Sequence, residues 1–492
     1  MSQKYLFIIT VAILGTLTLI PRIFDLGAFI SPDEIRWVAN TSGFTTKLAH
    51  GELSQLLRQP HPGITTQWLG ASTIRFDSWA VRKLPLVIGQ TILVLMLAYL
   101  AYRLWGASAG ILLGVLLALN PFLIAHTRVY AMDALLAVNL TVSVVALLLW
   151  HKEKATRYLL FSAFAAGAAI LSKLPGIIII PYAGVLFLHW SWRSRSATAY
   201  MRPGVLWLLS LGMSLGIILP SFALHPLGTI GDFAEFFRSD DYQELHQLSA
   251  AYYLQTLAFK TTPLHLAAVL TLVLGAAWST LHTEHVLAKK IRAALLTPSI
   301  GIFLTFAVLF VIQMAIGAKK GDRYILPSFI MLDVVTALVI TRLVALRRKN
   351  ITTIVLLAAT VGLLWQSIIV AQLHPHTLAY VNPLTRQFIG ARRLGWGEGL
   401  DLAAHYLNNK PQASELNVAA YFPTQFAYVF KGKTAPAHTW DNESIDYVVL
   451  YRAMFQRGDD AWETDVLNHF RSKIPEQVIS LSGIEMVWIY RQ

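Results

Sequence analysis

The chain has 492 residues, of which 55% are hydrophobic and only 14% are charged. Soluble domains carry about 25% charged residues, so this composition and a mean hydropathy of +0.54 place the protein in the membrane class. A net charge of +13 would suggest nucleic acid in a soluble protein. Here most basic residues lie in short loops between apolar runs, where they report topology. Cysteine is absent, which excludes disulfides, thiolate metal sites and a cysteine nucleophile.

The first apolar run begins after Lys4 and ends at Ile20. A secretory signal peptide would continue with small residues at a cleavage site, whereas Pro21 and Arg22 follow here. We therefore expect an uncleaved first span.

Apolar runs long enough to cross a bilayer recur along the chain. A bilayer core about 30 Å thick requires about 20 apolar residues in a helix. About eleven runs are candidates, at residues 4–24, 85–103, 107–125, 133–150, 157–172, 174–190, 203–221, 263–281, 297–317, 324–345 and 351–372. The fifth and sixth runs are short, and one bent or re-entrant pair is an alternative interpretation of them.

The loops between these runs differ in charge. One alternating set is rich in lysine and arginine, at Lys152, Lys154, Arg157, Arg193, Arg195, Arg202, Lys289, Lys290, Arg292, Arg342, Arg347, Arg348 and Lys349. Because positively charged loops stay in the cytoplasm, the N-terminus is predicted to be cytoplasmic and, after an odd number of spans, the C-terminal segment extracytoplasmic. We expect an integral protein of the plasma (inner) membrane.

Three sizeable segments are then predicted outside: residues 25–84, 222–262 and 373–492. The last has an ordinary soluble composition, and its patterns predict helices at 399–408 and 461–470 and strands at 416–421, 447–451 and 486–490. The predicted fold is a mainly α polytopic membrane protein. It has a transmembrane module over residues 1–372 and a small extracytoplasmic α/β domain over residues 373–492.

The first polar motif is Ser31-Pro32-Asp33-Glu34, directly after the first span. Ser at N-cap, Pro at N1 and Glu at N3 form a capping box, which is a sufficient structural explanation. A carboxylate at the membrane surface can also act as a base on an incoming hydroxyl. Both interpretations can hold, because the cap would fix Asp33 while its carboxylate points away from the helix.

Two histidine motifs follow. His61-Pro62-Gly63 marks a turn into a helix, and its histidine is either a surface residue or a near-neutral proton carrier. His126, Arg128 and Asp133 lie in the short outer segment before the fourth span. Asp133 can cap that helix and Arg128 can anchor at the interface. The alternative is a polar cluster that converges on the same site as Asp33.

Basic residues also occur at outer span ends. Lys173, between two spans, can simply snorkel toward the interface. Lys319, Lys320 and Arg323 lie on the outer side, against the topological bias. Either anionic headgroups or a bound lipid phosphate would account for them, since arginine grips phosphate through two parallel hydrogen bonds.

These polar clusters recur at the outer ends of spans, whereas the spans themselves carry few ionisable residues. Asp333 is the clearest exception, and no function follows from it. Charges inside the membrane typically mark ion or proton paths, so their scarcity disfavours a proton-coupled pump. It favours a site at the outer interface.

Other chemistries find less support. The pairs His282/His285 and His374/His376 lack further ligands at a recognisable metal-binding spacing. No cofactor is certain, and a divalent metal ion is compatible with the sequence but not required by it. No Gly-rich phosphate loop, serine elbow or metalloprotease motif is present, and no pattern indicates nucleic acid.

Together these residues resemble a known family, the polytopic lipid-phosphate-sugar glycosyltransferases of the GT-C class, which include protein O-mannosyltransferases and aminoarabinose transferases. The resemblance covers nearly the whole chain in order and topology. It rests on Asp33-Glu34, His61-Pro62-Gly63, the segment Arg128 to Asp133, Leu171-Ser172-Lys173, Asp322-Arg323-Tyr324-Ile325-Leu326-Pro327 and Gly395-Trp396-Gly397-Glu398-Gly399-Leu400.

The resemblance implies a GT-C helix bundle with amphipathic outer helices in the first loop. It implies that Asp33 is the catalytic base. Glu34 is expected in the same catalytic site, where it either orients a partner or serves only as the helix cap, because neighbours on a helix point about 100° apart. The resemblance also implies donor-phosphate binding by basic and neighbouring residues at outer span ends, and substrate binding by the remaining polar residues of these motifs. The first group is Arg323, Lys173, Arg128 and Tyr324, and the second is His61, His126, Asp133 and Asp322.

The expected reaction moves a sugar from a polyprenyl-phosphate donor to a hydroxyl or amine of a protein, lipid or glycan acceptor, by single displacement with inversion. Gly63 stands where mannosyltransferases usually have a second proline, and no inserted soluble domain is seen, so the acceptor stays open. A lipid-linked-sugar or small-molecule transporter or flippase is the main alternative, and a polysaccharide polymerase or ligase and a membrane scaffold are others. A transporter would show polar residues deep in the spans and paired broken helices.

Overall fold

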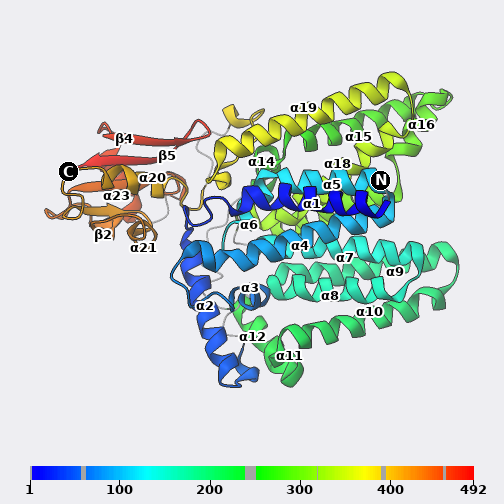
Figure 1. Ribbon diagram of the computed structural model, residues 1–492, viewed down its shortest axis with the longest axis horizontal. Helices are drawn as coiled ribbons and strands as arrows, with labels where there is room; N and C mark the ends of the chain where they lie inside the picture. The colour runs from blue at the N-terminus through cyan, green and yellow to red at the C-terminus, as the bar shows by residue number, and fades with distance from the viewer. Residues whose placement is uncertain (1–2, 57–61, 239–250, 318–319, 389–394, 458–460) are drawn as a thin grey trace.

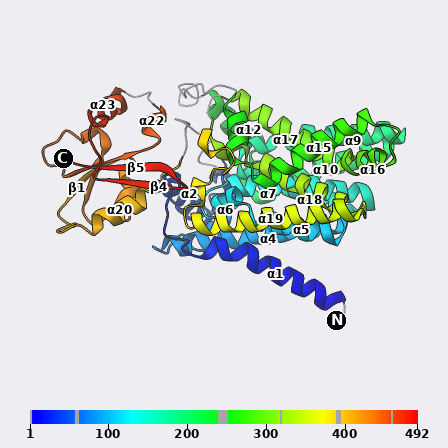
Figure 2. The same ribbon diagram turned by 90° about the horizontal axis from the view of Figure 1, so that it is seen from above.

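The computed structural model describes residues 3–56, 62–238, 251–317, 320–388, 395–457 and 461–492. A bundle of long helices occupies one side of the molecule and a small sheet with short helices occupies the other (Figure 1). Figure 2 shows the same division from above, with α1 (Gln3–Ile23) along the outside of the bundle. The predicted fold class, a helical membrane protein with a small C-terminal α/β part, is confirmed.

Each of the eleven predicted spans coincides with helical structure in the described part of the chain. Besides α1, these are α4 (Trp79–Trp105), α5 (Ala107–Leu119) with α6 (Pro121–Thr127), α7 (Asp133–Glu153), α8 (Thr156–Ser172), η2 (Leu174–Ile178) with α9 (Ile179–Ser194), α10 (Ala197–Ile218), α15 (Pro263–Leu281), α17 (Pro298–Ile316), η3 (Asp322–Ile325) with α18 (Leu326–Val344), and α19 (Lys349–Leu373).

Nine of these helices are, within the described residues, long and apolar enough to cross a membrane, or ten if the bent α5–α6 pair counts as one span. The 17-residue α8 is shorter. The bend therefore occurs in the third predicted run, by 64° between α5 and α6, and not between the fifth and sixth runs, which form the separate helices α8 and α9. Helix α7 lies at the centre, buried over nearly its whole length.

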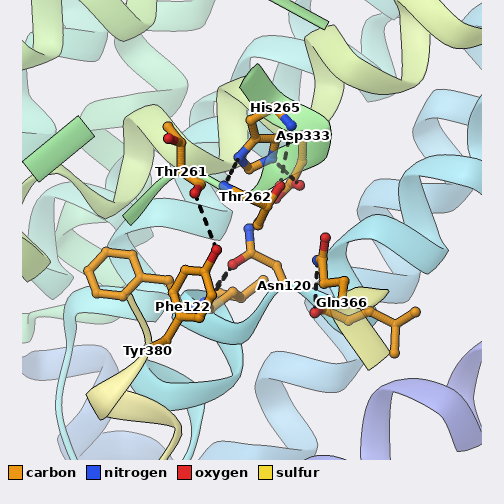
Figure 3. A network of polar contacts seen from close by, with 10 residues as sticks. Asn120, Phe122, Thr261, Thr262, His265, Asp333, Gln366 and Tyr380 are labelled. Atoms are coloured by element: carbon orange, nitrogen blue, oxygen red, sulfur yellow. Dashed lines mark hydrogen bonds and ion pairs between the residues drawn. The ribbon is translucent and has the colours of Figure 1, made fainter. Parts of the chain in front are cut away.

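A polar network explains why the chain can break at Asn120 inside an apolar environment (Figure 3). The Asn120 Oδ1 atom accepts hydrogen bonds from the backbone N–H groups of Phe122 and Leu123, both at 3.0 Å, and so caps the start of α6. Its Nδ2 donates to Asp333 Oδ2 at 2.8 Å. His265 contacts Asp333 Oδ1 at 2.7 Å through Nε2. Asp333 is thus a fully hydrogen-bonded buried residue.

The carbonyl groups at the end of α5 also find partners. Gln366 of α19 donates to the carbonyl of Leu119 at 2.8 Å (Figure 3). The buried guanidinium of Arg22 donates to the carbonyls of Ala118 and Leu117, at 3.1 and 3.0 Å. Backbone groups without a partner cost several kcal/mol in a bilayer, so these contacts make the break tolerable. Arg22 is one of the ionisable residues inside helices that the sequence analysis did not single out.

Two helices cross the end of the bundle, as the resemblance implied for the first outer loop. They are α2 (Pro32–Ala49) and α3 (Ile64–Gly70), and both lie at the end of the long helices that is nearer the sheet region in Figure 1. Gly63 precedes α3 with φ +53°, a conformation that proline cannot adopt because its ring fixes φ near −65°. This explains why glycine stands where mannosyltransferases have proline.

The rest of the helical region consists of short elements. They are η1 (Leu53–Gln55), α11 (Pro220–Leu224), α12 (Pro226–Arg238), α14 (Tyr252–Lys260), α16 (Val286–Leu295), η4 (Thr377–Ala379) and η5 (Arg386–Phe388).

The C-terminal sheet has five strands in the order β2-β1-β3-β5-β4. Strands β2, β1 and β3 are parallel, and β5 is antiparallel to both β3 and β4. Their bounds are β1 (Asn417–Ala420), β2 (Lys433–Pro436), β3 (Tyr447–Tyr451), β4 (Gln477–Leu481) and β5 (Ile484–Arg491), with helices α20 (Leu400–Asn408), α21 (Pro423–Ala427), η6 (Ala437–Thr439), α22 (Met454–Arg457) and α23 (Ala461–Phe470).

All five predicted elements of this region are confirmed, and two strands were missed. Strand β4 pairs with β5 through a tight turn at Ser482 and Gly483, where both residues have positive φ. Such turns favour Ser-Gly pairs, which was an available signal for this hairpin. Strand β2 is only four residues long and half exposed, so it lacks the apolar alternation that would identify it.

The sheet region contacts the helical region at several described points, and two of them involve α21 and the residue that follows it. The side-chain amide of Gln425 donates to the carbonyl of Ile30, just before α2. The ring of Tyr428 meets Trp79 edge-on, at the start of α4, with ring centroids 5.6 Å apart. The C-terminal region is therefore in contact with the segment that carries the first polar motif.

Candidate functional site

Asp33 and Arg323 form an ion pair, with Arg323 NH2 2.9 Å from Asp33 Oδ2. Asp33 lies in the first turn of α2, which begins where Pro32 fixes the backbone, and Arg323 lies in η3, directly before α18. Their side chains are 40% and 22% exposed. The pair therefore lies at the ends of two helices and remains accessible from outside.

A second ion pair continues from the first. Lys173 Nζ lies 2.7 Å from Asp133 Oδ1, and Arg323 Nε lies 3.7 Å from Asp133 Oδ2. Asp133 opens α7 and Lys173 follows α8, and both are buried. Four residues that the sequence analysis singled out thus form one row of alternating charges: Lys173, Asp133, Arg323 and Asp33. We call this row the charge row.

Tyr324 and Asp322 flank the charge row. The ring of Tyr324 lies 4.0 Å from the Nζ atom of Lys173, a cation–π contact. Asp322 accepts hydrogen bonds at Oδ1 from Tyr252 and Thr256 of α14, at 2.9 and 3.0 Å. These contacts attach η3 to α14 and hold the backbone from which Arg323 projects.

His126 of α6 lies next to the same residues. Its imidazole is 3% exposed, and neither ring nitrogen has a hydrogen-bond partner among the residues that the structure describes. The charges of Asp133 and Arg323 act on it. Buried imidazoles are normally hydrogen-bonded, so His126 stays a candidate for contact with a ligand.

The turn at Pro62 and Gly63 also lies near the charge row. The Gly63 N–H donates to the carbonyl of Ser172 at 3.1 Å, and Thr65 Oγ1 lies 2.7 Å from Ser172 Oγ. Ser172 directly precedes Lys173. His61 itself lies outside the described residues, so its predicted function is untested.

Glu34 and Arg128, two other residues proposed from sequence, do not join this row. Glu34 is buried, with Oε2 bound by its own cap residue and Oε1 2.8 Å from Lys83 Nζ. This arrangement favours capping and anchoring over catalysis. The guanidinium of Arg128 donates to three backbone carbonyls at the end of α1 and in the connection that follows it, at 2.7 to 2.9 Å. Arg128 therefore fixes that connection and contacts none of the predicted phosphate-binding side chains.

Trp396 is a residue of the site to which the sequence pattern assigns no chemistry. Its ring lies 3.8 Å from the guanidinium carbon of Arg323 and 6.3 Å from the ring of His126. The motif Gly395-Trp396-Gly397-Glu398-Gly399 carries part of the family resemblance but predicts no chemistry by itself. Nothing in the local sequence links residue 396 to residue 323, so only the tertiary structure could show this contact.

The arrangement combines one accessible carboxylate with cations held at fixed positions. A carboxylate can accept a proton, and a guanidinium and an ammonium can hold a phosphate. No group of three His, Asp or Glu side chains in the described ranges could hold a metal ion. The side chains therefore suit a reaction in which an anionic leaving group departs while a nucleophile loses a proton.

Two of three comparisons with known proteins find a similarity. Residues 61–221 match the family model for dolichyl-phosphate-mannose-protein mannosyltransferase, a segment that includes His126, Asp133 and Lys173. A search of curated proteins finds no match.

Among solved structures, ArnT from Cupriavidus metallidurans in the apo state aligns with a TM-score of 0.52 and 14% identity, over 99% of this chain and 98% of that one. ArnT from the same organism bound to undecaprenyl phosphate has a TM-score of 0.47 and 14% identity over the same shares. The Archaeoglobus fulgidus oligosaccharyltransferase tethered with an acceptor peptide has a TM-score of 0.47 and 12% identity, over 94% of this chain and 72% of that one.

Proposed function

Because the chain has the fold of the GT-C membrane glycosyltransferases and contains a mannosyltransferase family segment, we propose that it transfers a sugar from a polyprenyl-phosphate donor to an acceptor hydroxyl or amine. The structural likeness shows the fold, and the family model over residues 61–221 supports the enzyme class. The donor, the acceptor and the mechanism below are our proposal.

The observation that carries the proposal is the charge row. Arg323 and Lys173 are cations at helix ends, each paired with Asp133, and Arg323 reaches the accessible Asp33. A donor phosphate that binds Arg323 would compete with Asp33 for the guanidinium and so leave the carboxylate to the acceptor. This exchange couples donor binding to preparation of the base.

In the proposed step the acceptor oxygen or nitrogen attacks the anomeric carbon as Asp33 removes its proton. The bond between the anomeric carbon and the phosphate oxygen breaks, and the polyprenyl phosphate leaves with the electron pair. Phosphate is a stable anion, so no strong general acid is needed. Arg323 and Lys173 stabilise the charge that grows on it, and His126 can donate to a phosphate oxygen or to the sugar.

We propose that the site faces the extracytoplasmic side of the plasma membrane. The support is the charge of the loops. Asp133 and Arg323 lie at the starts of α7 and α18, whereas the lysine- and arginine-rich loops follow the other ends of these helices. Since basic loops stay in the cytoplasm, the charge row is expected on the opposite side. Accessibility of an introduced cysteine is a direct measurement of this topology, since the native chain has none. Labelling of Asp77→Cys by an impermeant reagent in intact cells supports the orientation, and labelling only after lysis contradicts it.

The function is tested with purified protein and a synthetic polyprenyl-phosphate sugar. Transfer to an added acceptor, or release of polyprenyl phosphate, is the expected result. A transporter would move the donor across a vesicle membrane without cleaving it. Intact donor after prolonged incubation with a panel of protein, lipid and glycan acceptors, together with donor translocation, would overturn the proposal.

A further inference from the structure

The loop Gly395–Gly399, which we call the glycine loop, has a conformation that depends on its glycines. Gly395, Gly397 and Gly399 have φ of +99°, +98° and +88°. A Cβ atom at Gly395 would lie 1.9 Å from the Tyr451 hydroxyl, and one at Gly397 would lie 2.4 Å from the Gln425 amide. Both the backbone angles and the close packing therefore select glycine at alternate positions.

The glycine loop is fixed to the central strand of the sheet. The Tyr451 hydroxyl donates to Glu398 Oε2 at 2.7 Å and accepts from the Gly397 N–H at 2.9 Å. Burial, together with the nearby Glu398 carboxylate, raises the pKa of Tyr451 well above its usual value, so the hydroxyl keeps its proton and continues to donate. Glu398 also accepts from the Trp396 N–H. These bonds hold Trp396 in one place relative to the sheet.

Trp396 projects from this loop onto Arg323, the cation in the middle of the charge row. A guanidinium carries its N–H donors around the edge of a flat group. Asp33 and Asp133 contact two nitrogens on that edge, and the indole covers a face. Contacts at the edge and at the face together determine the orientation of the plane, which neither carboxylate could do alone.

We propose that Trp396 is a positioning residue for Arg323, through which the C-terminal region completes the donor-phosphate site. The inference rests on the proposed function and goes further, because it makes the glycine loop part of the donor site. The indole holds the guanidinium plane so that the edge can meet a phosphate with two parallel hydrogen bonds. It also shields one face from water, which strengthens attraction to the anion.

The test compares three variants by their affinity for decaprenyl phosphate in detergent solution. Trp396→Ala is expected to weaken binding about tenfold, between the effects of an exposed and a desolvated cation–π contact. Trp396→Phe keeps an aromatic face and is expected to recover most of the loss. Tyr428→Ala is the matched control, because Tyr428 also projects an aromatic ring from the C-terminal region onto the helices but contacts Trp79. It is expected to bind like the wild type.

Two results would overturn the inference. One is wild-type affinity in Trp396→Ala. The other is an equal loss in Tyr428→Ala, which would mean that the aromatic contacts only dock the C-terminal region. Melting temperatures of all variants separate a loss of affinity from a loss of folding.

A double-mutant cycle with Arg323→Gln shows whether Trp396 acts through the guanidinium. The Trp396→Ala effect should shrink to less than twofold in the Arg323→Gln background. An undiminished effect would mean that Trp396 contacts the lipid phosphate directly, and the positioning role would be rejected.

Because decaprenyl phosphate carries no sugar, binding can be intact where transfer is absent. If the wild-type protein binds decaprenyl phosphate but never transfers a sugar, only the proposed function is contradicted. If the wild-type protein transfers a sugar and Trp396→Ala has the same activity and the same affinity, only this inference is contradicted.

Discussion

Arg323 donates a 2.9 Å hydrogen bond to Asp33 across 290 positions of sequence. The two residues approach because α2 crosses the end of the helix bundle (Figure 1), where η3 and the start of α18 also lie. The carboxylate remains 40% exposed, so it is accessible to an acceptor as well as bound to a cation. Among the described carboxylates of the charge row, Asp33 is the accessible one, since Asp133 is buried between Lys173 and Arg323.

Replacement of Asp33 by asparagine should lower turnover about 10²- to 10⁴-fold, because that is the usual contribution of a positioned general base. The melting temperature should stay close to that of the wild type, since the side chain is partly exposed. The measurement is kcat for release of polyprenyl phosphate from a synthetic donor. Asp77→Asn is the control, because the Asp77 side chain is fully exposed and lies outside the charge row. Normal turnover in Asp33→Asn would reject the assignment.

Replacement of Glu34 should affect stability before catalysis. Glu34→Gln leaves Lys83 buried without its anionic partner, and removing one member of a buried ion pair costs about 3–5 kcal/mol. We expect a clear fall in melting temperature in detergent, with kcat per folded molecule within a few fold of the wild type. A stable protein with a hundredfold lower kcat would instead show that Glu34 takes part in the reaction, as the sequence resemblance had suggested.

His126 should contribute to donor binding but little to folding. In the wild type, the imidazole of His126 meets the Phe122 ring edge-on, with ring centroids 4.7 Å apart. His126→Phe keeps a ring at this contact and removes two nitrogens that have no hydrogen-bond partner among the described residues. Removing an unpaired buried polar group is neutral or stabilising. We expect an unchanged or higher melting temperature and a KM for the donor about tenfold higher, consistent with loss of a hydrogen bond to a charged group. An unchanged KM would limit His126 to packing.

The buried network at Asp333 should be needed for stability, and its geometry allows a sharp test. Thr262 donates its N–H to His265 Nδ1, so His265 carries its proton on Nε2 and donates to Asp333. Asp333→Asn places an NH2 group against one of the two groups that donate to Asp333, the Asn120 amide or the His265 Nε2–H. The free energy of unfolding should fall by about 1–3 kcal/mol. The double variant Asn120→Asp/Asp333→Asn restores a donor and an acceptor at each contact. Its melting temperature should recover most of the loss, and failure to recover would contradict the network in Figure 3.

Much of the fold follows from local sequence. Eleven apolar runs coincide with helical structure, and nine or ten spans within the described residues are long and apolar enough to cross a membrane. The runs and the short apolar segments at β1, β3 and β5 depend on neighbours a few residues apart, which is why they could be predicted. Strand β2 was missed because four half-exposed residues carry too little pattern. Arg22 and Lys83 could not be recognised from local sequence, because each lies in a mostly apolar helix and its partner is distant in the chain. Arg22 donates to the carbonyls of Ala118 and Leu117, and Lys83 pairs with the carboxylate of Glu34.

The sequence by itself determined which residues could do chemistry, because side-chain type and position at a span end are local properties. It could not decide between the two interpretations of each residue, cap or base, anchor or phosphate ligand. Asp33 and Glu34 are adjacent, yet one meets Arg323 and the other is buried against Lys83, since neighbours on a helix point about 100° apart. Only the packing of α2, α7, α18 and the glycine loop decided which charges meet, because those contacts join segments up to hundreds of residues apart.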